Sequence, residues 1–165
     1  MPHIHTLEGQ IDFTADVFVV RGNKVLLRIH DKYKIWLAVG GHIELDEDPN
    51  DAAIREVKEE VGLDVILFSQ ESMRDDDDQG YKELVPPRFM NIHQISATHR
   101  HISLVYFARS AEGDVVPSGS DVSNDWHWFT KEELETNKYG IRSSIRHYAL
   151  TALSEAGWDD SPTEL

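Results

Sequence analysis

The sequence predicts an α/β fold in which a mixed β-sheet carries helices on its faces. Short strand-like segments rich in apolar and β-branched residues are interspersed with segments of helical periodicity, and the first two strands lie close enough to form a hairpin. The length of 165 residues, with 40% hydrophobic and 28% charged, is that of one compact domain with a substantial core. We therefore expect one domain over residues 1–165, with its core at about 10–156.

Six strands are expected, each bounded by glycine, proline or polar turn residues. They cover residues 11–20, 24–30, 35–39, 65–68, 101–108 and 126–129. Gly22-Asn23 marks the hairpin turn between the first two. Residues 69–90 have no regular pattern: the acidic run 75–78 reads as a solvated loop, with a cation site as the alternative, and Pro86-Pro87 excludes a strand there.

The first expected helix begins at Pro49, since proline suits a first helical turn, and Gly62 is a natural C-cap. Ala53, Val57 and Val61 recur at intervals of four, with Ile54 beside them, which is typical of an apolar helix face. A second helix follows Thr130, which with Glu133 forms a capping-box pattern. A third is expected over residues 141–156, with an apolar face formed by Ile145, Ala149 and Ala152, and residues 159–165 are expected to be frayed.

Charge narrows the classes of partner. The chain has 30 acidic and 16 basic residues, a net charge of −14, so it is expected to repel polymeric nucleic acid and anionic membranes. A small phosphate ligand remains compatible if a cation lies between it and the carboxylates. There is no run of 18 apolar residues, no secretory signal pattern and no cysteine, and we expect a cytoplasmic location.

The most informative residues are a glycine pair, Gly40-Gly41, and the acidic helix that follows it. Glu56, Glu59 and Glu60 stand at i, i+3 and i+4, so they are expected on one helix face. Two half-buried charges ~6 Å apart would repel by roughly 3 kcal/mol at an effective dielectric of about 20, and a divalent cation reverses that sign. Carboxylate oxygens select hard ions, which predicts Mg²⁺, with Mn²⁺ as a substitute, placed to bind a pyrophosphate.

This segment resembles the Nudix box: Gly, five residues, Glu, seven residues, Arg-Glu, an aliphatic residue, any residue, Glu-Glu, any residue, Gly, and an aliphatic residue. All nine specified positions are filled, by Gly41, Glu47, Arg55, Glu56, Val57, Glu59, Glu60, Gly62 and Leu63. Trp36 and Glu44 are also common in that family. The sequence departs from common family residues at Val39, Asp46 and Val61, and none of these positions is an expected metal ligand.

The resemblance implies an α/β/α sandwich that cleaves a nucleoside diphosphate linked to another moiety. Carried onto this sequence, it makes Glu56 and Glu60 the main metal ligands, joined by Glu59 and by the carbonyl of Gly41 or of its neighbour Gly40. It implies that Arg55 and Glu47 orient the loop and the helix. Members place the catalytic base differently. Glu59 or Glu56 is the expectation within the box, and Glu83, Glu112 and Asp121 remain open as bases on distant loops.

Substrate contacts are predicted less closely. Arg28, Arg88 and Arg100 are cations that would neutralise phosphate, with surface ion pairs as the alternative. Trp36 would stack on a base or pack in the core, and His42 adjoins the box loop. His93, His99 and His101 cluster in sequence, and the last two would face one way on a strand. A structural role is the leading interpretation of this cluster, ahead of a substrate contact by a residue such as His101 and of a second metal site.

Two other functions stay open at this point: a catalytically silent nucleotide-binding Nudix domain, and an isomerase of isoprenoid diphosphates. The isomerase type usually needs a cysteine in its site, and this chain has none. The expected ligand is a small nucleotide-type substrate, but the sequence does not choose among nucleoside triphosphates, dinucleoside polyphosphates, ADP-ribose and nucleotide sugars. Dimers are usual among similar proteins, which leaves a homodimer as an alternative to a monomer.

Overall fold

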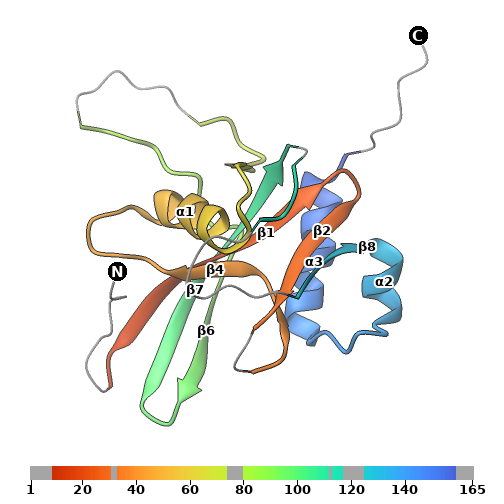
Figure 1. Cartoon of the computed structure of the whole chain (residues 1–165). Coiled ribbons are helices and arrows are strands. Elements are labelled where there is room, and N and C mark those ends of the chain that lie inside the picture. The colour runs from red at the N-terminus through yellow and green to blue at the C-terminus, as the bar shows by residue number, and fades with distance from the viewer. Residues whose placement is uncertain (1–8, 31–32, 74–79, 112, 117–124, 159–165) are drawn as a thin grey trace.

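The computed structural model describes residues 9–30, 33–73, 80–111, 113–116 and 125–158, and it shows a mixed sheet between helices (Figure 1). The strands are β1 (Ile11–Arg21), β2 (Lys24–Ile29), β3 (Trp36–Leu37), β4 (Val39–His42), β5 (Val65–Leu67), β6 (Phe89–Ser96), β7 (His99–Ser110) and β8 (Trp126–Thr130). The helices are α1 (Pro49–Val61), α2 (Lys131–Thr136) and α3 (Ser143–Ala156). The α/β/α arrangement expected from the sequence is confirmed.

β1 organises the sheet because it pairs with three strands. Along one edge it runs parallel to β7, with Ile11 opposite Arg100 and Val20 opposite Arg109. Its other edge is shared by two antiparallel partners, β4 near the start and β2 near the end. β7 carries β6 and β5 on its far side, and β2 carries β3 and β8.

The sheet buries an apolar layer on each face. Ala15, Val17 and Val19 of β1 point toward α1 and pack with Val57 and Val61 of that helix. The alternate residues of β1, Phe18 and Val20, point to the other face, where α3 contributes Ala149, Ala152 and Ala156. This alternation follows the period of two along a strand. No helix within the described residues is long and apolar enough to cross a membrane.

Three strands differ from the sequence-based expectation. The segment 35–39 is divided, and the glycine pair lies inside β4 rather than after a strand, because residues 39–42 pair with β1. β6 was not anticipated at all. Its alternation is masked by exposed polar residues such as His93 and Gln94, and its pairing to β7 in a hairpin defines it. The strand over 101–108 is longer, His99–Ser110, and is buried mainly in its second half.

The helix ends follow the expected signals. Asp48 caps α1 by accepting from the backbone N–H groups of Asn50 and Asp51, and Gly62 ends it with a left-handed φ of 73°. α3 begins at Ser143, two residues later than expected, with Ile141 buried ahead of it. Ile54 is 40% exposed, unlike the buried Val57 and Val61, so it lies outside the apolar face of α1. The runs 75–78 and 159–165 lie outside the described residues.

The capping box of α2 gives a stability prediction. Thr130 Oγ1 accepts from the N–H of Glu133, and Glu133 Oε2 accepts from the N–H of Thr130. Thr130→Ala removes one of these partners, and we expect a loss of about 1 kcal/mol in the free energy of unfolding. Urea denaturation measures it. Thr136→Ala is the control, because this exposed hydroxyl only bonds back to helix carbonyls, and an equal loss there would contradict the capping role.

Candidate active site

The glutamates of α1 divide into a buried pair and an exposed third member. Glu56 and Glu60 are 5% and 8% exposed, one helical turn apart. The Glu59 side chain is 53% exposed. The three therefore do not share one environment: two carboxylates are enclosed against the sheet and the third borders solvent. Burying two acids side by side is costly unless each has partners, and the structure supplies partners to both.

Arg55 connects the helix to the loop before it. Its Nε and Nη2 bind the two carboxylate oxygens of Glu47 at 2.9 and 2.6 Å, and these hydrogen bonds lower the pKa of Glu47. Its Nη1 donates to Glu56 at 2.8 Å and to Glu59 at 3.1 Å. Nη2 also donates to the carbonyl of His42 at 3.0 Å. The pairing of Glu47 with Arg55 expected from the sequence is confirmed, and Arg55 fixes the positions of two further glutamates.

The glycine pair is required because the backbone of β4 lies very close to neighbouring atoms. A Cβ at Gly41 would overlap the carboxylate of Glu56, and a Cβ at Gly40 would overlap the carbonyl oxygen of Ala15 on β1. The N–H of Gly40 donates to Glu60 Oε2 at 2.9 Å. The backbone of β4 therefore lies directly against both buried carboxylates, which no larger residue would permit.

Arg28 of β2 is buried beside Glu60. It is 8% exposed, and its Nη2 binds Glu60 Oε1. Burial raises the pKa of Glu60 to about 8, and the neighbouring charge of Glu56 acts in the same direction, while Arg28 and the Gly40 N–H oppose it. Among the described residues, Arg28 Nε has no hydrogen-bond partner. Arg28 is thus neither an open surface cation nor a surface ion pair.

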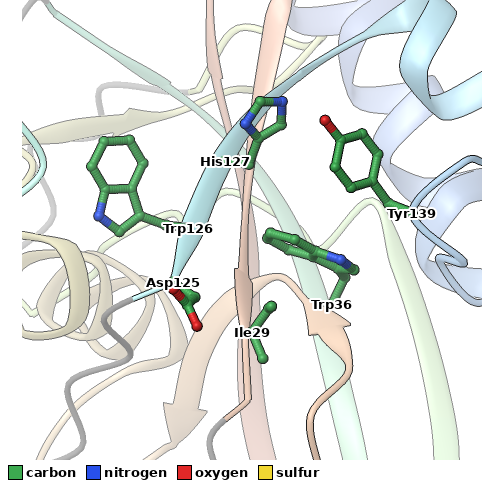
Figure 2. A pocket seen from close by; sticks show the side chains of 6 residues that line it. All are labelled: Ile29, Trp36, Asp125, Trp126, His127 and Tyr139. Carbon is green, nitrogen blue, oxygen red and sulfur yellow. The ribbon is translucent and has the colours of Figure 1, made fainter.

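Two other expected substrate contacts lie elsewhere. Arg88 is exposed and forms an ion pair with Glu155 of α3, at 2.8 Å. Trp36 packs edge-on against Phe129 and Tyr139 and lines a cavity of about 530 Å³. In Figure 2, Trp36, His127 and Tyr139 gather on one side of β8 and Trp126 points to the other. The full lining is Ile29, Trp36, Asp125, Trp126, His127 and Tyr139.

The histidines meet a residue that sequence reasoning missed. His99, His101 and His42 all direct Nε2 toward Asp12, whose carboxylate is almost fully buried. Burial and the charges of the neighbouring histidines lower the pKa of His101 to about 4, so its imidazole is neutral. His93 is exposed and hydrogen-bonded to Asn91. Asp12 carried no local signal, because only the pairing of β1 with β7 places it opposite His101.

Of the three loop residues considered as distant bases, only Glu83 is among the described residues. Its segment is held against the start of α1: Lys82 binds Asp48 at 2.6 Å, and the backbone N–H of Val85 donates to the Asn50 side chain at 2.7 Å. Glu112 and Asp121 lie outside the described residues, as part of 112 and 117–124.

Comparison with known proteins places this arrangement in a family. The sequence model of the NUDIX domain matches residues 11–148. A NUDIX-family hydrolase from Clostridium perfringens is 38% identical, with 87% of this chain and 96% of that chain covered and a TM-score of 0.78. A comparison with curated proteins found no match.

More distant solved structures share the fold. An ADP-ribose pyrophosphatase from Streptococcus suis is 19% identical, with 90% of this chain and 96% of that chain covered and a TM-score of 0.55. An Ap4A hydrolase from C. elegans is 18% identical, with coverages of 88% and 94% and a TM-score of 0.60.

Proposed function

Since this chain belongs to the NUDIX family and is a hydrolase of phosphoanhydride bonds, we propose that it is a Mg²⁺-dependent pyrophosphohydrolase. The reaction is NDP-X + H₂O → NMP + phosphate-X, in which water attacks one phosphorus and the P–O bond to the bridging oxygen breaks. The observation that carries this proposal is the pair of buried carboxylates, Glu56 and Glu60, enclosed between α1 and the glycine pair of β4.

The donor set fits a hard divalent ion. Glu56 and Glu60 offer oxygen atoms only, and the backbone carbonyls of Gly40 and Gly41 lie in the strand packed against them. Burial raises the pKa of Glu60 to about 8 and the charge of Glu56 acts in the same direction, so a bound cation would favour the ionised form. Glu56 and Glu60 would hold the ion, with the Gly41 carbonyl as a further donor. When bound, Mg²⁺ supplies charge neutralisation to the phosphoryl oxygens.

The protein's own residues position the reacting groups. Arg55 holds Glu56 and Glu59 in fixed relation to the loop, through its bidentate pairing with Glu47. The absence of side chains at Gly40 and Gly41 lets the backbone of β4 pack directly against Glu56 and Ala15, which keeps Glu56 in place. Arg28, with its buried Nε, is suited to donate to a phosphate oxygen while its Nη2 neutralises Glu60. His42, the next residue along β4, supports this arrangement through its carbonyl oxygen, which accepts from Arg55 Nη2.

Glu59 is proposed as the general base. It is the box carboxylate most open to solvent, and one donor of Arg55 orients it at 3.1 Å. We expect Glu59→Gln to lower kcat by about 10²–10⁴-fold without changing the Mg²⁺ concentration that gives half the maximal rate. Steady-state kinetics across a Mg²⁺ titration measure both quantities. Recovery of kcat at saturating Mg²⁺ would contradict the base and make Glu59 a ligand.

The aromatic cavity at Trp36 is proposed to receive the base or the X group. Trp36 lies on β3, opposite Ile29 of β2, and Ile29 follows Arg28, which reaches Glu60. Because neighbouring residues of a strand point to opposite faces of the sheet, Trp36 and Ile29 lie on the other side of β2 from the buried carboxylates. The flat rings that border the cavity are of the kind that stack on nucleobases. Arg88 remains a proposed substrate contact, although it is engaged by Glu155, whereas the His101 side chain is turned toward Asp12.

The test of the proposed function is a substrate panel with product identification. ADP-ribose, diadenosine tetraphosphate, a nucleotide sugar and a nucleoside triphosphate are incubated with the protein, with Mg²⁺ or with chelator. We expect Mg²⁺-dependent release of a nucleoside monophosphate from at least one substrate. When the reaction is run in ¹⁸O-labelled water, mass spectrometry should find one labelled oxygen in the products. Nucleotide binding without turnover of any phosphoanhydride would instead support a silent nucleotide-binding domain.

A further inference from the structure

Four side chains outside the glutamate site converge from three adjacent strands: Asp12 of β1, His42 of β4, and His99 and His101 of β7. The sheet register brings them together. Asp12 lies opposite His101 in the parallel β1–β7 pair, and Thr14, two residues beyond Asp12 on the same face, lies opposite His42. His99 precedes His101 by two residues and faces the same way. Their convergence is therefore a consequence of topology, not of local sequence.

The ligand atoms meet around one carboxylate oxygen. Asp12 Oδ2 lies 3.0 Å from His99 Nε2, 3.5 Å from His42 Nε2 and 4.0 Å from His101 Nε2. His99 Nε2 and His101 Nε2 are 2.9 Å apart, and the four atoms all lie within 4.8 Å of one another. Three imidazoles that turn the same ring nitrogen toward one carboxylate oxygen have the orientation of a ligand set.

We propose that Asp12, His42, His99 and His101 form a second metal site, selective for a zinc-type ion. Imidazole nitrogens suit Zn²⁺ and related ions, whereas the glutamate site has only hard oxygen donors, so the two sites select different metals. A tetrahedral zinc with bonds of about 2.0–2.1 Å places its ligand atoms about 3.3–3.4 Å apart, and the distances observed here bracket that value.

The Asp12–histidine cluster is buried enough to hold a structural ion, yet open enough on one side for the ion to enter. The Asp12 side chain is 2% exposed, while the three histidine side chains are 14–25% exposed, so solvent reaches the cluster from the histidine side. The ion would join β1, β4 and β7 at the end of the sheet. It would also steady the glutamate site indirectly, because the His42 carbonyl accepts from Arg55. His42 is thus a positioning residue for the glutamate site.

The experiment uses the full chain without a histidine tag, stripped of metal and titrated with Zn²⁺ against a chromophoric chelator. We expect one tightly bound Zn²⁺ per chain, retained in excess Mg²⁺, and a rise in Tm on adding Zn²⁺ that Mg²⁺ does not reproduce. Co²⁺ is expected to give the intense visible absorption of a tetrahedral ion. Zinc binding that Mg²⁺ displaces, or a Co²⁺ spectrum typical of an octahedral ion, would overturn the proposal.

Matched variants locate the ion. Because loss of even an indirect partner costs metal affinity about 10–100-fold, the double variant His99→Ala/His101→Ala is expected to lose at least about 100-fold. If circular dichroism shows that the alanine variants fold poorly, Asp12→Asn serves in their place. It keeps the side-chain shape and should still weaken Zn²⁺ binding. His147→Ala, an exposed histidine on α3, and Glu60→Gln should bind Zn²⁺ like the wild type. Wild-type affinity in the folded double variant, or in Asp12→Asn, would overturn the assignment independently of any hydrolase activity.

Discussion

Glu60→Gln is expected to lower kcat by about 10²–10³-fold, the range seen when one preorganised electrostatic contact is removed from an active site. The amide keeps an acceptor for the N–H of Gly40 but removes the charge that would hold Mg²⁺. It also leaves Arg28 without its charged partner, so a lower Tm is expected as well. Steady-state kinetics with the best substrate of the panel, over a Mg²⁺ titration, measure the loss.

Two further variants separate chemistry from stability. Glu56→Gln removes the second buried carboxylate while Arg28 keeps its partner, so its kcat should fall similarly with a smaller change in Tm. Glu132→Gln alters an exposed glutamate of α2 and should behave as the wild type. Unchanged turnover in folded Glu60→Gln and Glu56→Gln would remove both residues from the proposed site.

Gly41→Ala is expected to lower kcat by about 10²-fold through displacement of Glu56. The added Cβ would overlap that carboxylate, so either Glu56 or the β4 backbone must move. Displacement of a catalytic group by 1 Å is enough for a loss of about this size. The test is to measure kcat at saturating substrate and the Mg²⁺ concentration that gives half the maximal rate. That Mg²⁺ concentration should rise.

Gly113→Ala is the matched control. A Cβ at Gly113 meets no atom within 4 Å, so this variant should retain its kcat. The φ of 157° is unfavourable for alanine, so some loss of stability is expected. If Gly41→Ala and Gly113→Ala lose stability alike and both retain kcat, the close packing of Glu56 against β4 has no catalytic consequence.

The elements that the sequence predicted well are those with strong local signals. The Gly22-Asn23 hairpin, the proline start and glycine end of α1, and the capping box of α2 all depend on residues within a few positions of one another. The sequence does not predict β6 because its exposed side chains mix apolar residues, such as Met90 and Ile92, with polar ones, and its pairing with β7 is what makes it a strand. The sequence predicts too short a β4 because a glycine pair usually ends a strand, whereas here the packing of β4 on β1 requires glycine.

The candidate site shows the same division. The spacing of Arg55, Glu56 and Glu60 predicts that they act together, and the structure joins Arg55 to Glu56 and buries Glu60 one helical turn further along α1. The spacing could not show that Glu59 borders solvent or that Arg28 binds Glu60, because both depend on how α1 meets the sheet. Asp12 and His42 join the histidines of β7 only through strand register, which no sequence pattern at those positions indicates.

The central claim is that Glu56 and Glu60 hold the divalent ion that hydrolysis requires. Crystals of the protein soaked in Mn²⁺ with a non-hydrolysable nucleotide analogue, measured by anomalous diffraction, test it most directly. We expect an anomalous peak bonded to the carboxylates of both residues and to a phosphate oxygen. A peak only at the Asp12–histidine cluster, or bound to phosphate with neither glutamate as a ligand, in an enzyme active with Mn²⁺, would contradict it.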